Sequence, residues 1–360
     1  MSGTPLSPGS IIGIVGGGQL GRMLAMAAAQ LGYRCHIYAP DEAPPAAEVS
    51  AFFTRAAFDD EAALSAFAGQ VDLVTYEFEN IGAGPLKALT DRSAVHPPVA
   101  ALAIAQDRLD EKNFVTDLGG RPAPFRPVWS REDLDRALAE LGTPAILKTR
   151  RLGYDGKGQV RIMHPADADE AWAAVRGAPC VLEGFVRFDA EFSILLCRAA
   201  SGEIMLWDAP RNTHESGILA RSEVPGPALP AEQVDDAKAL ARKVADALNY
   251  VGVLTLEFFV GPDGPVFNEM APRVHNSGHW TIEGAVTSQF ENHIRAVLGL
   301  PLGSPALVAP RVVMDNLIGD QADAWPTLLA DPNAHLHLYG KGAPSPGRKM
   351  GHVTYLSTPD

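Results

Sequence analysis

The sequence predicts a mixed α/β and α+β protein in three parts: an N-terminal Rossmann-like part, a larger central part, and a small C-terminal β-rich part. The chain has 360 residues, which suits two or three domains of about 150 residues each. Over roughly the first 100 residues, short apolar runs alternate with helical stretches, as in a parallel, doubly wound sheet. A segment rich in Pro, Gly and Ser, Pro301 to Pro310, reads as a linker before the last part.

The composition excludes several classes of protein. Thirty Lys and Arg stand against 43 Asp and Glu, a net charge of -13, so the chain is not expected to wrap nucleic acid or to coat an anionic membrane. No charge-free apolar run approaches the roughly 18 residues of a membrane span, and the N-terminus lacks the basic start of a signal peptide. Three widely spaced cysteines fit a reducing compartment. We therefore expect a cytoplasmic protein with neither nucleic acid nor membrane as partner.

The N-terminal part, residues 1–106, supplies the alternation of strands and helices. The expected strands are Ile11 to Val15, Arg34 to Ala39 and Val71 to Thr75, and the expected helices are Arg22 to Leu31 and Glu61 to Phe67. The part closes near His96-Pro-Pro98.

The first glycine motif, Gly16-x-Gly18-x-x-Gly21, lies between a strand and a helix, where a dinucleotide-binding fingerprint would lie. Asp41 follows about 20 residues later, near the position of a ribose-binding acid. One interpretation is therefore an NAD(P)-dependent oxidoreductase. The alternative is a tight turn whose glycines let a strand and a helix pack closely.

The central part, residues 107–300, contains more strands than the first. Expected helices are Leu134 to Leu141, Ala231 to Leu248 and Val286 to Leu298. Expected strands are Ala145 to Thr149, Gln159 to Met163, Cys180 to Val186, Glu191 to Cys197, Val253 to Val260 and Val266 to Met270. The C-terminal part, residues 301–360, carries strand-like runs at Arg311 to Met314, His335 to Tyr339 and His352 to Leu356.

A second glycine loop indicates phosphate binding. Lys148 ends a strand, and Gly153, Gly156 and Gly158 follow within a loop between two strands. Without Cβ atoms, such a loop can bring backbone N–H groups against phosphate oxygens, and Lys148 and Lys157 can neutralise phosphate charge. The loop is then a lid over a nucleotide. The alternative is a flexible basic surface hairpin.

A pair of carboxylates is placed by a predicted hairpin turn. Gly261-Pro-Asp-Gly-Pro265 fits a three-residue loop with a Gly bulge, which sets Glu257 opposite Glu269, with Phe259 and Phe267 on the same face. Two like charges so placed favour a cation between them, and oxygen ligands beside phosphate select Mg²⁺ or Mn²⁺. Asn268 adds an oxygen ligand. In the alternative register, shifted by one residue, each Glu faces solvent.

Together the motifs resemble the ATP-grasp superfamily and, within it, the N5-carboxyaminoimidazole ribonucleotide synthetase family. The most specific matching segment is Asn268-Glu-Met-Ala-Pro-Arg-Val-His-Asn-Ser-Gly-His-Trp280. Others are Gly16 to Arg22, Thr75-Tyr-Glu-Phe-Glu-Asn80, Asp107-Arg108, Gly153 to Gln159, Ser288 to Glu291 and Pro346 to His352.

The resemblance implies the fold, the reaction and the partners. The fold is an ATP-grasp fold with a pre-ATP-grasp domain at 1–106, the grasp domain at 107–300 with a mobile lobe at about 143–206, and a small C-terminal β-rich domain at 301–360. In this family the first Gly loop faces the acceptor substrate and binds no nicotinamide. The implied substrates are ATP, bicarbonate and 5-aminoimidazole ribonucleotide, with Mg²⁺ or Mn²⁺ as the metal and a homodimer as the assembly.

The resemblance also implies a role for individual residues. The ATP contacts are Arg108, Lys148, Gly153, Tyr154, Asp155, Gly156, Lys157, Gly158, Gln159, Glu183, Gly184, Phe185, Val186, Glu191, His214, Asn268 and Glu269. The ribonucleotide pocket is Glu77, Tyr154, Asp155, Arg273, His275, Asn276, Ser277, Lys341 and Arg348. The catalytic set is Arg273, His275, Asp155 and Lys157, and the metal ligands are Glu257 and Glu269. Glu77 is preferred to Glu79 as the pocket acid, but the sequence does not separate the two.

The sequence departs from the family pattern in the second glycine loop, and Arg211-Asn-Thr-His214 matches its family motif only loosely. Relatives usually have Gly-Gly before the Tyr-Asp of the second loop, whereas this chain has Leu152-Gly153. Other ATP-grasp enzymes, such as a formate-dependent glycinamide ribonucleotide transformylase or a biotin carboxylase-like protein, are the nearest alternatives. A nicotinamide-dependent oxidoreductase and a non-catalytic nucleotide sensor are alternatives from other classes.

Overall fold

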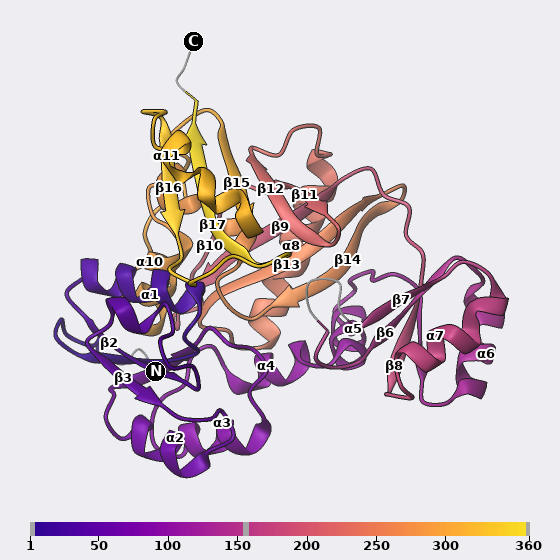
Figure 1. The fold of residues 1–360 in the computed structure, drawn as a ribbon, viewed down its shortest axis with the longest axis horizontal. Coiled ribbons are helices and arrows are strands. Elements are labelled where there is room, and N and C mark those ends of the chain that lie inside the picture. The colour runs from indigo at the N-terminus through magenta and orange to yellow at the C-terminus, as the bar shows by residue number, and fades with distance from the viewer. Residues whose placement is uncertain (1–3, 154–157, 358–360) are drawn as a thin grey trace.

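The computed structural model describes residues 4–153 and 158–357 and consists of three sheets with their covering helices (Figure 1). The first part of the chain forms one parallel sheet at the lower left of Figure 1, and a small lobe with its own sheet extends to the right. The remaining strands form one large sheet between and above them.

The N-terminal sheet is parallel and has the order β3-β2-β1-β4. Its strands are β1 (Ile11–Val15), β2 (Arg34–Ala39), β3 (Phe52–Arg55) and β4 (Leu73–Tyr76), and its helices are α1 (Gln19–Gln30), η1 (Ala47–Val49), α2 (Glu61–Ala68) and α3 (Ala83–Thr90). Ile12 and Ile14 pack in a core with α1, while Val15 and Val74 pack in another with α2 and α3, so both faces are covered. The predicted doubly wound arrangement is confirmed. The sequence missed β3, a four-residue edge strand, so the expected third strand is β4.

The small lobe is an antiparallel sheet with the order β5-β8-β6-β7. Two helices, α4 (Val99–Ala105) and α5 (Arg108–Asp117), lead to it. It contains β5 (Phe125–Val128), α6 (Arg131–Leu141), β6 (Ala145–Thr149), β7 (Gln159–Ile162), η2 (Pro165–Asp167), α7 (Ala168–Ala174) and β8 (Cys180–Gly184). This sheet therefore begins and ends about 20 residues earlier than the lobe expected at about 143–206.

The large sheet joins the central and C-terminal parts of the chain. Its order is β14-β13-β9-β11-β12-β15-β17-β16, with β10 paired to β9. Its strands are β9 (Glu191–Arg198), β10 (Ile204–Leu206), β11 (Arg211–Glu215), β12 (Ile218–Val224), β13 (Gly252–Gly261), β14 (Gly264–Ala271), β15 (Val312–Ile318), β16 (Ala334–Leu338) and β17 (Lys349–Leu356). The accompanying helices are α8 (Ala231–Ala247), η3 (Asn276–Gly278), α9 (Thr281–Gly284), α10 (Gln289–Val297), η4 (Gly319–Ala324) and α11 (Trp325–Leu328). Because β15 pairs with β12, the C-terminal strands continue this sheet across the predicted linker.

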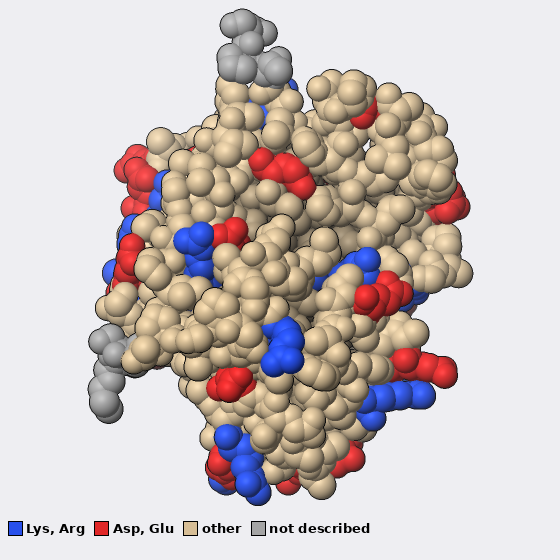
Figure 2. Space-filling model, turned by 90° about the vertical axis from the view of Figure 1, so that its left-hand side faces the viewer, with Lys and Arg blue, Asp and Glu red and all other residues tan. Residues whose placement is uncertain are grey.

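On the face that Figure 2 shows, acidic and basic side chains are intermingled, and neither charge forms a large continuous patch. Such a face does not attract a polyanion at long range. Among the helices of the described ranges, none combines the length and the apolar character needed to span a bilayer.

Candidate active site

A cavity of ≈ 1840 Å³ lies where the three sheets meet. A cavity of this size is large enough for a nucleotide together with a second substrate. The predicted site residues that line it are Glu77, Arg108, Lys148, Gly153, Gln159, Glu191, His214, Glu257, Asn268, Glu269, Arg273, His275, Asn276, Lys341 and Arg348. The fold therefore gathers into one space residues that are as far apart in sequence as Glu77 and Arg348.

Some predicted site residues lie elsewhere. Tyr154, Asp155, Gly156 and Lys157 fall outside the described residues. Among the described residues, Gly158, Glu183, Gly184, Phe185, Val186 and Ser277 do not line the cavity. Glu183 and Ser277 are buried directly behind residues that do, which gives each a supporting position described below.

The carboxylate pair is formed by the β13–β14 hairpin, although its turn differs from the prediction. Gly261 pairs with Gly264 across a two-residue turn, so the expected three-residue loop is wrong. The register then shifts between Glu257 and Phe258, where Asn268 is the extra residue of a bulge, and this shift restores Glu257 opposite Glu269. Phe267 lies before the bulge and pairs with Phe258 in the core, not on the carboxylate face as expected. The predicted pairing of the two acids is confirmed, through a different local structure.

Glu257 is held by a buried chain of polar side chains. Nε2 of His275 lies 3.0 Å from Oε1 of Glu257, and Nδ1 of His275 lies 2.8 Å from the hydroxyl of Ser277. The Ser277 hydroxyl donates in turn to that of Ser193 (3.0 Å). The backbone N–H of Ser277 also lies 3.3 Å from Nδ1, so Ser277 contacts this nitrogen through both its backbone and its side chain. Burial raises the pKa of Glu257, but the charge and the hydrogen bond of His275 outweigh it and hold this pKa at about 2.

Arg273 is fixed by an acid that the sequence left ambiguous. Its Nε donates to Oε2 of Glu79 at 2.9 Å, and its side chain is 15% exposed. Glu77 instead accepts the backbone N–H of Gly18 at 2.7 Å, at the start of α1. Burial, the largest effect, raises the pKa of Glu77. The two acids therefore have different positions: Glu79 orients Arg273, and Glu77 closes the first glycine loop.

The same contact decides against the nicotinamide interpretation of the first glycine motif. Gly16 has φ +115°, and a Cβ there would come within 2.6 Å of Cγ of Glu77. A dinucleotide pyrophosphate would need the backbone N–H groups at the start of α1. A carboxylate already lies there, and it would repel a pyrophosphate.

Helix α5 positions the predicted Arg108 and adds Lys112, which the sequence interpretation missed. Asp107 caps the helix and pairs with Arg150 at 2.8 Å. Arg108 lies 3.4 Å from Glu269, whereas Lys112, one turn later, reaches Glu183 at 3.0 Å. Their spacing of four residues puts both on one face, which is the signal that could have found Lys112.

Glu183 on β8 joins the two lysines beneath the cavity. Nζ of Lys148 donates to Oε2 of Glu183 at 2.8 Å, and Lys112 pairs with its Oε1. All three side chains are at most 10% exposed. Burial raises the pKa of Glu183, but Lys148 and Lys112 outweigh burial and hold it at about 2. Lys148 is therefore positioned by an ion pair and not by its strand alone.

A second pair lies on the other side of the cavity. Nδ1 of His214 on β11 lies 2.7 Å from Oε2 of Glu191, the first residue of β9. Burial lowers the pKa of His214, but its hydrogen bond to Glu191 and the charge of Glu257 outweigh burial and raise it. Glu191 and His214, both among the nucleotide contacts that the resemblance implies, are thus neighbours.

Leu152, the departure from the family pattern, adopts a left-handed backbone conformation with φ +63°. Glycine reaches this region freely, whereas other residues incur a cost of about 1–2 kcal/mol. The backbone therefore keeps the shape that a glycine would favour, and the leucine side chain is 73% exposed.

The loop after β16 brings basic residues to the cavity. Nζ of Lys341 donates to the backbone oxygen of Lys349 at 2.7 Å and lies 5.4 Å from the ring centroid of Tyr339. Arg348 is exposed and lines the same cavity. The positive charges of Lys341 and Arg348 can therefore bind an anionic group at the part of the cavity beside this loop.

The hairpin acids fit a divalent metal ion. Glu257 and Glu269 face each other from adjacent strands and Asn268 bulges beside them, which provides hard oxygen donors at the cavity wall. Glu269 is 45% exposed there, and Nη1 of Arg108 lies 3.4 Å from its Oε2.

Three family models together match most of the chain. They are the ribonucleotide synthetase preATP-grasp domain at residues 10–106, the ATP-grasp domain at 113–290, and the phosphoribosylaminoimidazole carboxylase C-terminal domain at 312–360. The fold and the site thus define an ATP-grasp protein.

Individual relatives narrow this class. The N5-carboxyaminoimidazole ribonucleotide synthase of Brucella melitensis is 51% identical over 359 residues, 99% of each chain. A solved N5-carboxyaminoimidazole ribonucleotide synthetase in complex with ADP is 41% identical with a TM-score of 0.94, covering 99% of this chain and 94% of that one. The synthase of Aspergillus clavatus, solved with ADP and 5-aminoimidazole ribonucleotide, is 30% identical with a TM-score of 0.91, covering 97% and 94%. The chain belongs to the family of N5-carboxyaminoimidazole ribonucleotide synthases.

Proposed function

We propose that this chain carboxylates 5-aminoimidazole ribonucleotide to N5-carboxyaminoimidazole ribonucleotide in purine biosynthesis, using ATP and bicarbonate and releasing ADP and phosphate. The observation that carries the proposal is the single cavity in which the acids of the β13–β14 hairpin, the Arg273–His275 segment and the basic C-terminal loop meet. A ligand set of two anions and a ribonucleotide needs this combination of charges. The relatives solved with ADP and 5-aminoimidazole ribonucleotide support the same assignment.

The reaction needs an activated carboxyl group, because hydroxide is a poor leaving group from bicarbonate. A bicarbonate oxygen takes the γ-phosphoryl group of ATP, giving ADP and carboxyphosphate. Carboxyphosphate releases phosphate and carbon dioxide, and the exocyclic amine of the ribonucleotide attacks the carbon dioxide and loses a proton. The protein contributes positioning and charge neutralisation, as in other phosphoryl transfers.

The described residues divide this work between them. Arg108 and Lys148 neutralise ATP phosphates, and Glu191 with His214 binds the nucleoside end. Arg273 and His275 hold the bicarbonate and the carboxyphosphate, with Ser277 positioning His275 from behind. Lys341 and Arg348 bind the phosphate of the ribonucleotide. Asp155 and Lys157, in the undescribed part of the second Gly loop, are proposed to assist proton transfer and phosphate binding.

A divalent ion, Mg²⁺ or Mn²⁺, would be held by Glu257 and Glu269 with Asn268 beside them. When bound, it neutralises the charge of the ATP phosphates. A homodimer, a cytoplasmic location and the domain limits 1–106, 107–300 and 301–360 remain predictions alongside it.

The test is ADP release by the purified protein with ATP and Mg²⁺, omitting bicarbonate and the ribonucleotide in turn. We expect turnover only when both are present. Equal ATP hydrolysis without 5-aminoimidazole ribonucleotide would overturn the substrate assignment. Turnover with glycinamide ribonucleotide and formate instead would favour the transformylase alternative.

The role of Glu79 gives a further prediction. We expect Glu79→Gln to lower kcat about 10²-fold, because Arg273 loses its charged partner and a displacement of about 1 Å is enough for a loss of this size. Steady-state ADP release with both substrates saturating measures the effect. Glu48→Gln is the control: it removes the negative charge of Glu48, whose side chain is 51% exposed and pairs with Arg22, and it should keep wild-type kcat. An unchanged kcat in Glu79→Gln would show that Arg273 needs no orientation by this acid.

A further inference from the structure

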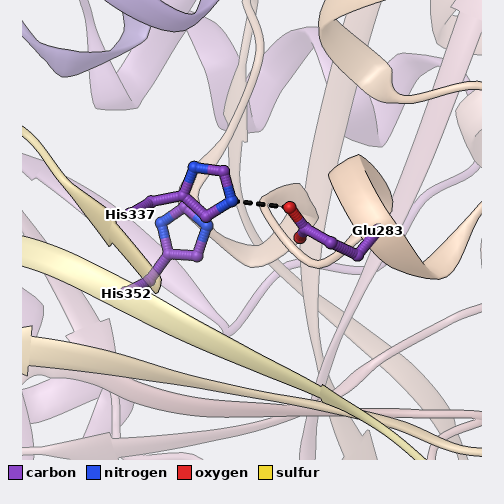
Figure 3. Close-up of side chains that lie close together, drawn as sticks. All are labelled: Glu283, His337 and His352. Carbon is purple, nitrogen blue, oxygen red and sulfur yellow. Dashed lines mark hydrogen bonds and ion pairs between the residues drawn. The ribbon is translucent and has the colours of Figure 1, made fainter. Parts of the chain in front are cut away.

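A second group of possible metal ligands lies outside the cavity, beside the C-terminal hairpin. Figure 3 shows Glu283 of α9, His337 of β16 and His352 of β17, with one ligand atom of each within 4.8 Å of the others. Nε2 of His337 lies 2.6 Å from Oε1 of Glu283, and the two imidazole rings stack at 4.5 Å between centroids. None of the three belongs to the machinery assigned above, and none lines the large cavity.

The polar atoms of this group are not fully satisfied. Oε2 of Glu283 and Nε2 of His352 are buried, and neither has a hydrogen-bond partner among the described residues. The same is true of Nε2 of the neighbouring His279, whose ring centroid lies 5.1 Å from that of His352. Buried polar atoms without partners are costly, so two of them within one group of possible ligands, Glu283 and His352, indicate an occupant that supplies the missing contacts.

The surroundings orient one of the rings as metal-binding histidines are oriented. The hydroxyl of Tyr339 lies 2.8 Å from Nδ1 of His352, which is fully buried. In the tautomer in which Nδ1 donates to this oxygen, the buried Nε2 keeps a lone pair that can bind an ion.

We propose that Glu283, His337 and His352 form a binding site for a divalent transition-metal ion, with Zn²⁺ as the best fit. Two imidazole nitrogens and one carboxylate oxygen are a common set of three protein ligands for zinc, with water in the fourth position. Tetrahedral ligands lie about 3.3 Å apart, so the ion requires the contact between Glu283 and His337 to open by roughly 0.7 Å. The side chains of Glu283 and His337 are 14% and 23% exposed, which leaves a path for entry.

The site would connect segments that matter for the acceptor end of the cavity. Glu283 follows the Arg273–Trp280 segment by a few residues, and His337 and His352 lie on the two strands that flank the loop with Lys341 and Arg348. An ion here would hold that loop against the segment that carries Arg273 and His275, so its role is positional.

Co²⁺ titration of chelator-stripped protein tests the proposal, because cobalt occupies zinc sites and its visible d–d bands report the geometry. The titration is done with MgADP present in excess, so that the hairpin acids are occupied by a hard ion. We expect a single Co²⁺ per chain with the strong bands of four-coordination, displaced by Zn²⁺, and a higher Tm when Zn²⁺ is added.

Matched variants locate the ion. His337→Gln and Glu283→Gln should lose the Co²⁺ bands and the rise in Tm, while His335→Gln should keep both. His335 is an exposed histidine two residues earlier on the same strand, so it controls for the loss of an imidazole. If His337→Gln bound Co²⁺ as wild type does, or if wild type gave no bands and no rise in Tm with Zn²⁺, the proposal would be wrong. The wild-type measurements stand alone if a variant fails to fold.

Discussion

Glu269→Gln is expected to lower turnover by about 10³-fold or more, since the loss of several kcal/mol of phosphate-charge neutralisation corresponds to that factor. Glutamine keeps the shape of the side chain and removes its negative charge. Glu269 lies on the cavity wall, 45% exposed and opposite Glu257, so a metal ion held by these two acids would lose one of its two charged ligands. The measurement is kcat for ADP release with bicarbonate and the ribonucleotide present.

The fold of this variant is expected to remain intact, because Glu269 is not buried within the core. Far-UV circular dichroism and Tm test this point. Asp263→Asn is the matched control: it removes one carboxylate charge from the exposed turn of the same hairpin and should keep wild-type kcat. A Glu269→Gln variant that retained more than about a tenth of wild-type turnover would contradict the metal-ligand role.

The β13–β14 hairpin shows which features can be predicted from turn sequences and which cannot. Turn chemistry predicted that Glu257 and Glu269 face each other, and they do. The turn has two residues instead of three, and the bulge at Asn268 compensates by adding one residue to β14. A bulge is set by what packs on each face of the sheet, and here Phe267 turns into the core beside Phe258. Hydrophobic alternation alone does not show on which side of the acids the extra residue falls.

The bounds of the helices and strands also agree with the prediction at some positions and differ at others. The strands Arg34–Ala39 and Ala145–Thr149 have the predicted bounds, because each is a short β-rich run between breakers. Helix α6 begins three residues before the prediction, since the side chain of Ser130 accepts the N–H of Asp133. Helix α10 begins three residues after it, since Ser288 caps that helix in the same way. Apolar periodicity located both helices, and the capping residues set their first turns.

The supporting residues of the site were harder to find than the lining ones. Motifs identified Arg273 and Lys148, but two further contacts depend on elements far apart in sequence: that of Glu79 with Arg273, and that of Lys112 with Glu183, the partner of Lys148. Glu79 is 194 residues from Arg273. Pairing at this distance is decided by how the sheets are placed relative to one another, and no local pattern encodes it.

The buried ion pairs of Glu183 lead to the largest expected effect on stability. We expect Glu183→Gln to lower the free energy of unfolding by about 3–5 kcal/mol, because it leaves Lys112 and Lys148 buried without their carboxylate. Urea denaturation at pH 7 measures the change. Glu140→Gln in the same lobe removes the exposed partner of Arg126, and this control should cost less than about 1 kcal/mol.

The pH dependence separates an ionic contribution from a packing defect. The pKa of Glu183 is about 2 in the folded protein, below its ordinary value of 4.5. Between pH 4.5 and pH 2 the carboxylate is therefore charged in the folded protein but largely protonated in the unfolded chain. The stability from this charge is fully present above about pH 4.5 and is lost as the pH falls toward 2. The difference in unfolding free energy between wild type and Glu183→Gln should therefore be constant from pH 7 to pH 5 and should narrow below pH 4.5. A difference that stayed constant in acid would assign the loss to packing of the amide and not to the charge on Glu183.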